Sequence, residues 1–196
     1  FCMKYTGPKV KLSRRLGIPL TARAARVMEK RPYPPGMHGR NQEFKKGRPS
    51  VYKEQLLEKQ RLRAQYNVSE KQLRGYYAKA NRQEGNVGEN LLQLLESRLD
   101  ALVLRGGLAS TIYAARQYVN HGHVQVNGRK VDIQSYLLKP GDVITVKPKS
   151  RRLDCFQNAV QQAVTPRYLQ LVPDDLRITY LSKPQTQDIP VICELS

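Results

Sequence analysis

Residues 111–131 read TIYAARQYVNHGHVQVNGRKV. The first half places apolar residues at helical spacing, and Ser110 or Thr111 can cap the start of this helix with a side-chain oxygen. The helix is expected to run to about Asn120, because Gly122 can adopt the left-handed conformation that commonly ends a helix. The stretch therefore begins with one short helix.

The second half of the stretch changes from a period of about 3.6 residues to a period of 2. Val124 and Val126 alternate with a polar residue, and Asn127-Gly128 is a strong signal for a two-residue hairpin turn. Pro140-Gly141-Asp142 predicts a further turn, before a short strand at 143–146. The helix should thus be followed by a small antiparallel sheet.

A longer helix is expected before this unit, over residues 89–105. Its apolar side consists of Leu91, Leu95, Leu99 and Leu102. The polar residues Gln93, Glu96 and Asp100 are expected to face away from that side. Arg105-Gly106-Gly107 supplies a cation in the last turn and glycine beyond it, which ends the helix. Residues 91–150 are therefore predicted to form a module of two helices and a short sheet.

Two further helices are predicted over residues 51–90. The apolar positions of the first fall within one arc: Tyr52, Leu56, Leu62 and Tyr66. Ser69 and Gln72 form an S-x-x-Q capping pattern that starts the second. The apolar positions of the second are Leu73, Tyr76, Tyr77 and Ala80. We interpret the four tyrosines as core or domain-interface residues in preference to platforms for base stacking. After Ser150 a helix over 151–164 and strands near 168–172 and 177–181 are expected.

The first 50 residues combine many Lys and Arg with only two acidic residues, Glu29 and Glu43. Repeated Pro and Gly break any long helix or strand in this region. We interpret residues 1–45 as an extended basic arm that has little core of its own and becomes ordered against a phosphate surface. A disordered, solubilising tail is the alternative interpretation.

The whole chain contains 34 Lys and Arg against 16 Asp and Glu, a formal net charge of +18. A charge of this sign and size attracts polyanions. Cys2, Cys155 and Cys193 are too few and too scattered to indicate a disulfide framework or a metal site, which favours a reducing compartment and no cofactor. No run approaches the ~20 apolar residues that span a bilayer. These features predict a nucleic-acid partner and no membrane.

Several stretches carry a family resemblance: ESRLD at 96–100, ARQYVNHGHVQVNGRKVDI at 115–133, SY at 135–136, KPGD at 139–142, GENLL at 88–92, EKQ at 58–60, R-x-x-Y at 63–66, PPG-x-HG at 34–39, RR-x-G at 14–17 and Y-x-GP at 5–8. They closely resemble the S4 family of small-subunit ribosomal proteins. The two helices and hairpin alone also resemble the RNA-binding module of RNA-modifying enzymes. Matches across residues 1–90 favour the ribosomal protein.

The resemblance implies an α+β fold with the extended arm at 1–45, a mostly helical domain at 46–90 that is completed by 151–196, and the small module inserted at 91–150. It further implies early binding to a multi-helix junction of small-subunit ribosomal RNA, a role in subunit assembly, and an influence on translational accuracy. The implied partners are this RNA, neighbouring small-subunit proteins and mRNA near its path into the subunit. The implied location is a cytoplasmic or organellar ribosome.

The chain also departs from the family pattern. Zinc-binding members carry cysteines where Val10 and Ser13 stand here, so no zinc site is expected. Many bacterial members have arginines where this chain has Ile112 and Tyr113, so a phosphate contact there is absent or replaced by stacking. The sequence starts at Phe1 and stops where family members tend to continue, so residues are expected to be missing at both ends.

Double-stranded RNA is recognised mainly through phosphates, 2′-hydroxyls and shape, which requires cations at fixed separation with short polar donors between them. The module offers such residues on one expected charged face: Thr111, Arg116, Gln117, Asn120, His121, His123, Asn127, Arg129 and Lys130. Thr111 can present helix-start amides to a phosphate, and Arg116 a two-pronged guanidinium. Candidates outside the module are Arg14, Arg15, Arg40, Lys59 and Arg63.

Each candidate has a simpler interpretation. Arg116 can pair with Asp100 or Glu96 instead of RNA. His121 and His123 lack a third ligand for a metal, and packed or solvated histidines at a helix end are common. Asn127 serves the turn first. Glu96 and Asp100 lie one helical turn apart, but exposed carboxylates on a charged helix explain this spacing without catalysis.

Two other function classes fit the sequence less well than a ribosomal protein. An RNA-modifying enzyme needs a catalytic domain, and the sequence has no phosphate-binding loop, no clustered Cys and His, and no nucleophile elbow. A membrane-surface protein needs a helix that combines a broad apolar face with a cationic one, and none is found. A structural RNA-binding protein of the ribosome is therefore the prediction.

Overall fold

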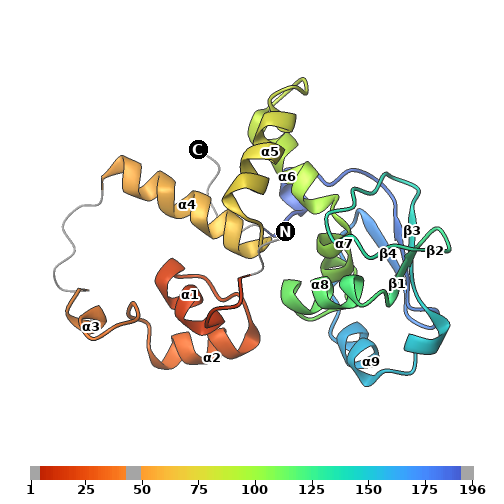
Figure 1. Ribbon diagram of the computed structural model, residues 1–196, viewed down its shortest axis with the longest axis horizontal. Coiled ribbons are helices and arrows are strands. Elements are labelled where there is room, and N and C mark those ends of the chain that lie inside the picture. The colour runs from red at the N-terminus through yellow and green to blue at the C-terminus, as the bar shows by residue number, and fades with distance from the viewer. Residues whose placement is uncertain (1–4, 43–49, 191–196) are drawn as a thin grey trace. The chain divides into compact units, whose positions relative to one another are not determined.

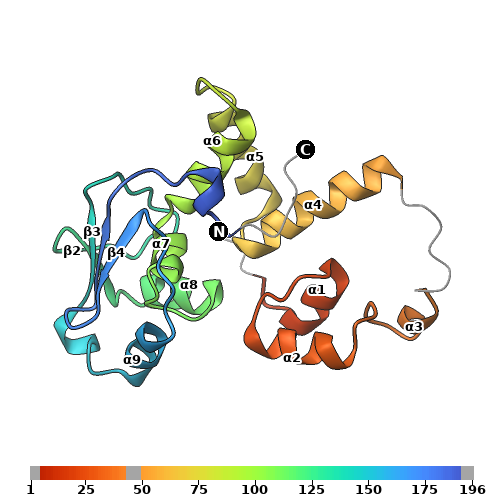
Figure 2. The same ribbon diagram turned by 180° about the vertical axis from the view of Figure 1, so that it is seen from behind.

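The computed structural model of the chain describes residues 5–42 and 50–190. Figures 1 and 2 show its elements from opposite sides. The chain divides into two compact units, the first within residues 1–73 and the second within residues 74–190. None of the described helices is long and apolar enough to cross a membrane.

The first unit contains four helices in its described residues: α1 (Lys9–Leu16), α2 (Ala22–Lys30), α3 (Gly39–Gln42) and α4 (Val51–Gln65). Leu16 and Ile18 form a small buried cluster with Ala64 of α4, and Leu57 packs against it. The prediction that the arm is extended is therefore wrong, because α1 and α2 form within it and its buried residues pack against α4. Glycine ends a helix here instead of preventing one: Gly17, with φ +74°, terminates α1.

The capping pattern at Ser69 is confirmed. Ser69 N–H donates to Gln72 Oε1 at 3.0 Å, and Gln72 N–H donates to Ser69 Oγ at 3.3 Å, so each residue satisfies a backbone donor of the other. The helix that follows, α5 (Glu70–Ala80), crosses the boundary between the units. Among the four tyrosines interpreted as core, Tyr66 and Tyr76 are buried, whereas Tyr52 and Tyr77 are 74% and 56% exposed.

The single helix predicted over 89–105 is two helices, α6 (Val87–Glu96) and α7 (Leu99–Arg105). The backbone of a later segment enters the break between them. Leu138 N–H donates to Ser97 O at 2.9 Å, and Leu99 N–H donates to Tyr136 O at 2.8 Å. Glu96 and Asp100, on either side of this break, were expected to face solvent and are instead completely buried.

Helix α8 (Ile112–Asn120) is followed by a five-stranded antiparallel sheet in the order β2-β1-β3-β5-β4. The strands are β1 (Val124–Val126), β2 (Arg129–Lys130), β3 (Val143–Val146), β4 (Leu169–Val172) and β5 (Arg177–Tyr180). Two short 3₁₀ helices, η1 (Pro148–Ser150) and η2 (Thr186–Asp188), and helix α9 (Asp154–Gln161) complete the described elements. The predicted α+β class with a small antiparallel sheet is confirmed.

The C-terminal strands differ from the expected domain organisation. Strand β5 pairs with β3, through Ile144 opposite Ile178, so residues 169–180 extend the sheet of the module instead of completing a helical domain with 46–90. Alternate residues of β3 and β5 are buried and form one apolar face of the sheet: Ile144, Val146, Ile178 and Tyr180. Helices α7 and α8 lie on one side of this sheet in both views (Figures 1 and 2). The end of α7 packs closely on the sheet at Gly106, where a larger residue would clash because an added Cβ would lie 2.2 Å from Ile178 Cδ1.

Candidate nucleic-acid interface

Of the two residues that could cap the start of α8, Ser110 and Thr111, it is Thr111 that does so. Thr111 has extended backbone angles, and its Oγ1 accepts a hydrogen bond from Ala114 N–H at 3.2 Å. The hydroxyl hydrogen remains able to donate, and the first turn of a helix carries N–H groups without intrahelical partners. The arrangement fits the predicted contact with a phosphate.

Arg116 does not lie on an exposed face, and that part of the prediction is wrong. Its side chain is 3% exposed, its Nε donates to Gln134 Oε1 at 2.9 Å, and the same nitrogen lies 3.6 Å from Asp100 Oδ2. The pairing with Asp100, which the sequence left open as the alternative, is the one observed. Arg116 thus joins α8 to α7 and to the segment around residue 134.

Arg98 belongs to the same buried group of charges. Its Nη1 donates to the Tyr76 hydroxyl at 2.7 Å, and its guanidinium carbon lies 5.4 Å from the centre of the Tyr76 ring. Burial is the largest influence on Arg98 and opposes its charge, but the hydrogen bonds and charges of Asp100 and Tyr76 together outweigh it, so the pKa of Arg98 is raised above its ordinary value. The guanidinium therefore stays charged inside the protein.

The exposed candidates of the module gather where α8 ends and the hairpin returns. Gln117, Asn120 and His121 are exposed, as are Arg129 and Lys130 of β2. Gly122 shows that the two elements meet, because an added Cβ at this glycine would lie 2.5 Å from Lys130 Cε. Gly122 has φ +69°. A cation from the hairpin is thus held against the end of the helix.

We call these five residues the hairpin–helix surface: Gln117, Asn120, His121, Arg129 and Lys130. Thr111 caps the opposite end of α8. Lys130 Nζ also lies 3.6 Å from Asp132 Oδ2. Both of these side chains are more than half exposed, so water screens this ion pair. A phosphate can therefore compete for the lysine.

His123 is half-buried and serves the fold. Its Nδ1 lies 2.8 Å from Ser150 Oγ, and its ring packs edge-on to Tyr118 and Phe156. Burial lowers the pKa of His123, and the nearby charges of His121 and Lys147 lower it further. Among residues 5–42 and 50–190, no group of three or more His, Cys, Asp or Glu side chains could hold a metal ion.

Asn127 shapes the hairpin turn. It has φ +49°, its Nδ2 donates to Asp142 Oδ1 at 2.8 Å, and its Oδ1 accepts from Val143 N–H at 2.9 Å. Asparagine tolerates this left-handed conformation better than most residues. The interpretation of Asn127 as a turn residue first agrees with these contacts.

The candidates of the first unit are differently engaged. Arg14 donates to Tyr33 O from Nη2 at 2.8 Å and stacks over the Tyr33 ring, so it braces the local fold. Arg15 and Arg40 are exposed. Lys59 Nζ and Arg63 Nη1 lie 2.9 and 3.6 Å from the carboxylate oxygens of Glu70.

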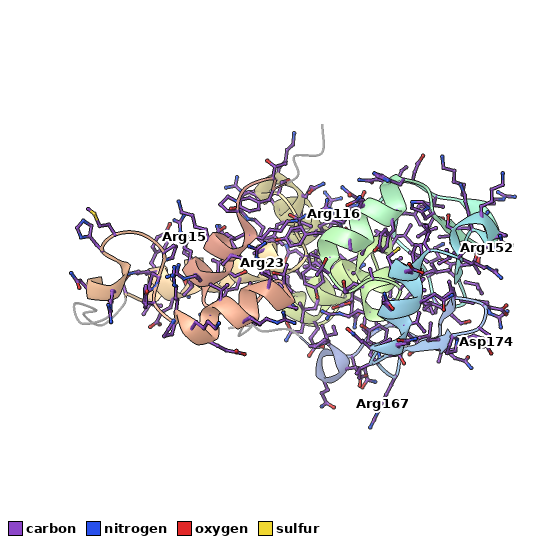
Figure 3. All side chains as sticks on the ribbon, turned by 90° about the horizontal axis from the view of Figure 1, so that it is seen from below. Arg15, Arg23, Arg116, Arg152, Arg167 and Asp174 are labelled. Atoms are coloured by element: carbon purple, nitrogen blue, oxygen red, sulfur yellow. The ribbon has the colours of Figure 1, made fainter. Side chains whose placement is uncertain are left out.

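Two exposed cations of α2, Arg23 and Arg26, were not singled out from the sequence. Figure 3 labels Arg15 and Arg23 among the side chains of this unit. TARAAR at 21–26 repeats the Thr-x-x-Ala-Ala-Arg pattern of TIYAAR at 111–116, which predicts a second capped helix start. It does not predict exposed cations there, because Arg116 in the matching position is buried. Thr21 caps α2 as Thr111 caps α8, by accepting from the N–H three residues on at 3.2 Å.

Two family models match the chain: the ribosomal protein S4/S9 N-terminal domain over residues 4–96 and the S4 domain over residues 97–144. Similar curated proteins are each named small ribosomal subunit protein uS4. The one from Streptomyces avermitilis is 51% identical over 192 residues, which is 95% of this chain and 92% of that protein. The one from Thermobifida fusca is 46% identical, over 96% of this chain and 94% of that protein. The one from Micrococcus luteus is 47% identical, over 94% and 90% respectively.

Proposed function

The chain belongs to the S4 family of small-subunit ribosomal proteins, and on that premise we propose that its hairpin–helix surface binds a multi-helix junction of the small-subunit ribosomal RNA. It is a structural constituent of the small ribosomal subunit and not an enzyme. Its partners are ribosomal RNA and other ribosomal proteins. The alternative of a module from an RNA-modifying enzyme is set aside, because the family resemblance extends over 95% of the chain.

The contact between Lys130 and Gly122 carries the proposal. It brings a cation of β2 against the end of α8, where Asn120 and His121 are exposed. Short polar donors thus stand beside a fixed positive charge, which suits the phosphates and 2′-hydroxyls of folded RNA. Arg129 adds a second exposed cation on the same strand.

Arg116 has an indirect role in this proposal. Because it is buried against Asp100 and Gln134, it holds α8 in place and does not touch RNA. His123 and Asn127 position the surface in a similar way, through Ser150 and Asp142 respectively. The direct contacts are therefore proposed for the exposed residues alone.

The first unit supplies a separate set of proposed contacts. Arg15, Arg23, Arg26 and Arg40 are exposed cations on or beside short helices, where phosphates can reach them. We further propose that the chain acts early in subunit assembly, influences translational accuracy and lies near the path of mRNA into the subunit. These roles rest on membership of the family.

The test is a binding measurement with a junction-containing fragment of small-subunit ribosomal RNA and an unrelated RNA of equal length. The full chain should prefer the junction, and Arg129→Ala with Lys130→Ala should reduce that preference. A matched control removes two exposed cations elsewhere in the same unit, Arg167→Ala with Lys183→Ala. Equal affinity for both RNAs would contradict the proposal. A chain that neutralises six to ten phosphates should lose roughly 10³–10⁵ in affinity between 50 and 200 mM salt.

A further inference from the structure

A second group of cations in the module lies outside the hairpin–helix surface. Residues 147–152 read KPKSRR, with four basic side chains in six positions. Lys149 and Arg152 are exposed, and Lys147 is half-buried. Within the described residues none of these three forms an ion pair, whereas Arg151 Nη1 lies 3.8 Å from Asp175 Oδ1. We call this stretch the 147–152 segment.

The fold of the segment leaves two of these cations in solvent. Residues 148–150 form the 3₁₀ helix η1, which ends before Arg152. Arg151 N–H and Leu153 N–H donate to the carbonyl oxygens three residues back, those of Pro148 at 3.4 Å and Ser150 at 3.2 Å. Lys149 and Arg152 are exposed on either side of Ser150, which is 8% exposed and faces inward. Figure 3 shows Arg152 at the edge of the unit.

The segment is fastened directly to the end of α8. Lys147 N–H donates to His123 O at 2.9 Å, and Ser150 Oγ lies 2.8 Å from His123 Nδ1. His123 follows His121 and Gly122, which belong to the end of the helix that Lys130 covers. Two hydrogen bonds therefore fasten the 147–152 segment to His123, the residue that directly follows Gly122.

We propose that Lys149 and Arg152 bind phosphates of the same ribosomal RNA and so extend the hairpin–helix surface across η1. This proposal rests on the proposed function. Charge favours RNA over an acidic protein, because Lys149 and Arg152 add two exposed cations to Arg129 and Lys130 of the same unit. Arg151 is excluded from the proposed contacts, since its Nε donates to Val146 O at 3.2 Å and braces the turn.

The experiment measures binding of the full chain to the junction-containing RNA over a range of salt concentrations. The test variant is Lys149→Gln with Arg152→Gln, and the matched control is Lys183→Gln with Arg167→Gln. Both remove two exposed cations from the same unit, and Figure 3 places Arg167 at a separate edge from Arg152. Loss of two phosphate contacts should reduce the slope of log affinity against log salt by about 1.4 to 1.8. The control should change this slope much less.

Three results would overturn the proposal. If test and control variants lose affinity equally, the effect is one of net charge and not of this site. If the test variant binds RNA as the wild type does but is not incorporated into small subunits, the segment serves a protein partner instead. If the wild type itself shows no preference for the junction, the proposed function fails together with this inference. A circular dichroism spectrum unchanged by both substitutions confirms that each variant is folded.

Discussion

Asp100 accepts two hydrogen bonds from one guanidinium: Arg98 Nε donates to Oδ1 at 2.9 Å and Arg98 Nη2 donates to Oδ2 at 2.6 Å. Both side chains are completely buried. Arg116 Nε lies a further 3.6 Å from Oδ2, so one carboxylate faces two buried cations. A buried charge is stable only when it is paired and hydrogen-bonded. Asp100 is therefore the residue on which this part of the core depends.

Replacement of Asp100 with Asn keeps the shape of the side chain and removes its charge. Arg98 and Arg116 then remain buried without a carboxylate, and removal of one partner of a buried pair typically costs about 3–5 kcal/mol. We expect a fall of this size in the free energy of unfolding, measured by urea denaturation. The control Glu84→Gln removes an exposed carboxylate of the same unit and should change the value by less than about 0.5 kcal/mol. A loss below about 1 kcal/mol for Asp100→Asn would contradict the role assigned to the pair.

The buried carboxylates mark the limit of what periodicity can predict. A helical pattern assigns charged residues to the outer face, and so it placed Glu96 and Asp100 in solvent. Glu96 is instead buried, where it accepts from Arg105 Nη2 at 2.9 Å and from the Tyr168 hydroxyl at 3.3 Å. Tyr168 lies just before β4, 72 positions beyond Glu96 in the sequence. Such partners become visible only when the tertiary structure is known.

Local signals, in contrast, predicted the ends of elements well. The caps at Ser69 and Thr111, the left-handed Gly122 and the turn at Asn127 each depend on residues within a few positions of one another. The break at Ser97 depends on Leu138, and the pairing of β5 with β3 depends on residues more than thirty apart. Likewise the exposed candidates on β2 were predictable from the hairpin, whereas the burial of Arg116 was not.

Gly122 should tolerate no side chain. Its φ of +69° disfavours any L-residue, and a Cβ would lie 2.5 Å from Lys130 Cε and displace that lysine. Gly122→Ala should cost roughly 1–2 kcal/mol in stability and also weaken RNA binding. The matched control is Gly75→Ala within α5, where a Cβ meets nothing within 4 Å, so the protein should be stabilised by roughly 0.5–1 kcal/mol. Equal binding by Gly122→Ala and the wild type would show that the placement of Lys130 does not matter.

His123 should make stability depend on pH. Burial and the charges of His121 and Lys147 lower its pKa in the folded chain, while the unfolded chain keeps a value of about 6.5. The unfolded state therefore binds the proton first as the pH falls. The contribution of the neutral ring is present above about pH 6.5 and is lost as the pH falls towards the folded pKa.

This dependence can be isolated by a difference between two proteins. Urea denaturation from about pH 8 to about pH 5 should show a steeper loss of stability in the wild type than in His123→Gln, which cannot take up the proton. His121→Gln removes one of the charges that lower the pKa of His123 but leaves the hydrogen bond between His123 and Ser150 in place, so its loss of stability should be less steep than that of the wild type. Parallel curves for the wild type and His123→Gln would rule out His123 as the source.

Glu70 pairs with two of the cations that the sequence offers as candidates for RNA binding, Lys59 and Arg63. Lys59 Nζ lies 2.9 Å from Oε1, and Arg63 Nη1 lies 3.6 Å from Oε2, with all three side chains about one-third or more exposed. Exposed ion pairs of this kind contribute about 0–1 kcal/mol, so a phosphate can displace the carboxylate at small cost. Glu70→Gln removes the competing anion. Affinity for the junction-containing RNA should therefore rise by about twofold to fivefold.

The increase must be separated from a simple gain of net positive charge. Glu54 provides the comparison, because it is an exposed carboxylate in the first turn of α4 just as Glu70 lies in the first turn of α5. Glu54→Gln removes the same negative charge from a similar place near a helix start, where such a charge is favourable. None of the ion pairs of the described residues includes Glu54, so this variant releases no cation. A larger gain for Glu70→Gln would indicate that released Lys59 and Arg63 reach the RNA. Equal gains would assign the effect to net charge, and a loss of affinity would mean that Glu70 orients these cations for binding.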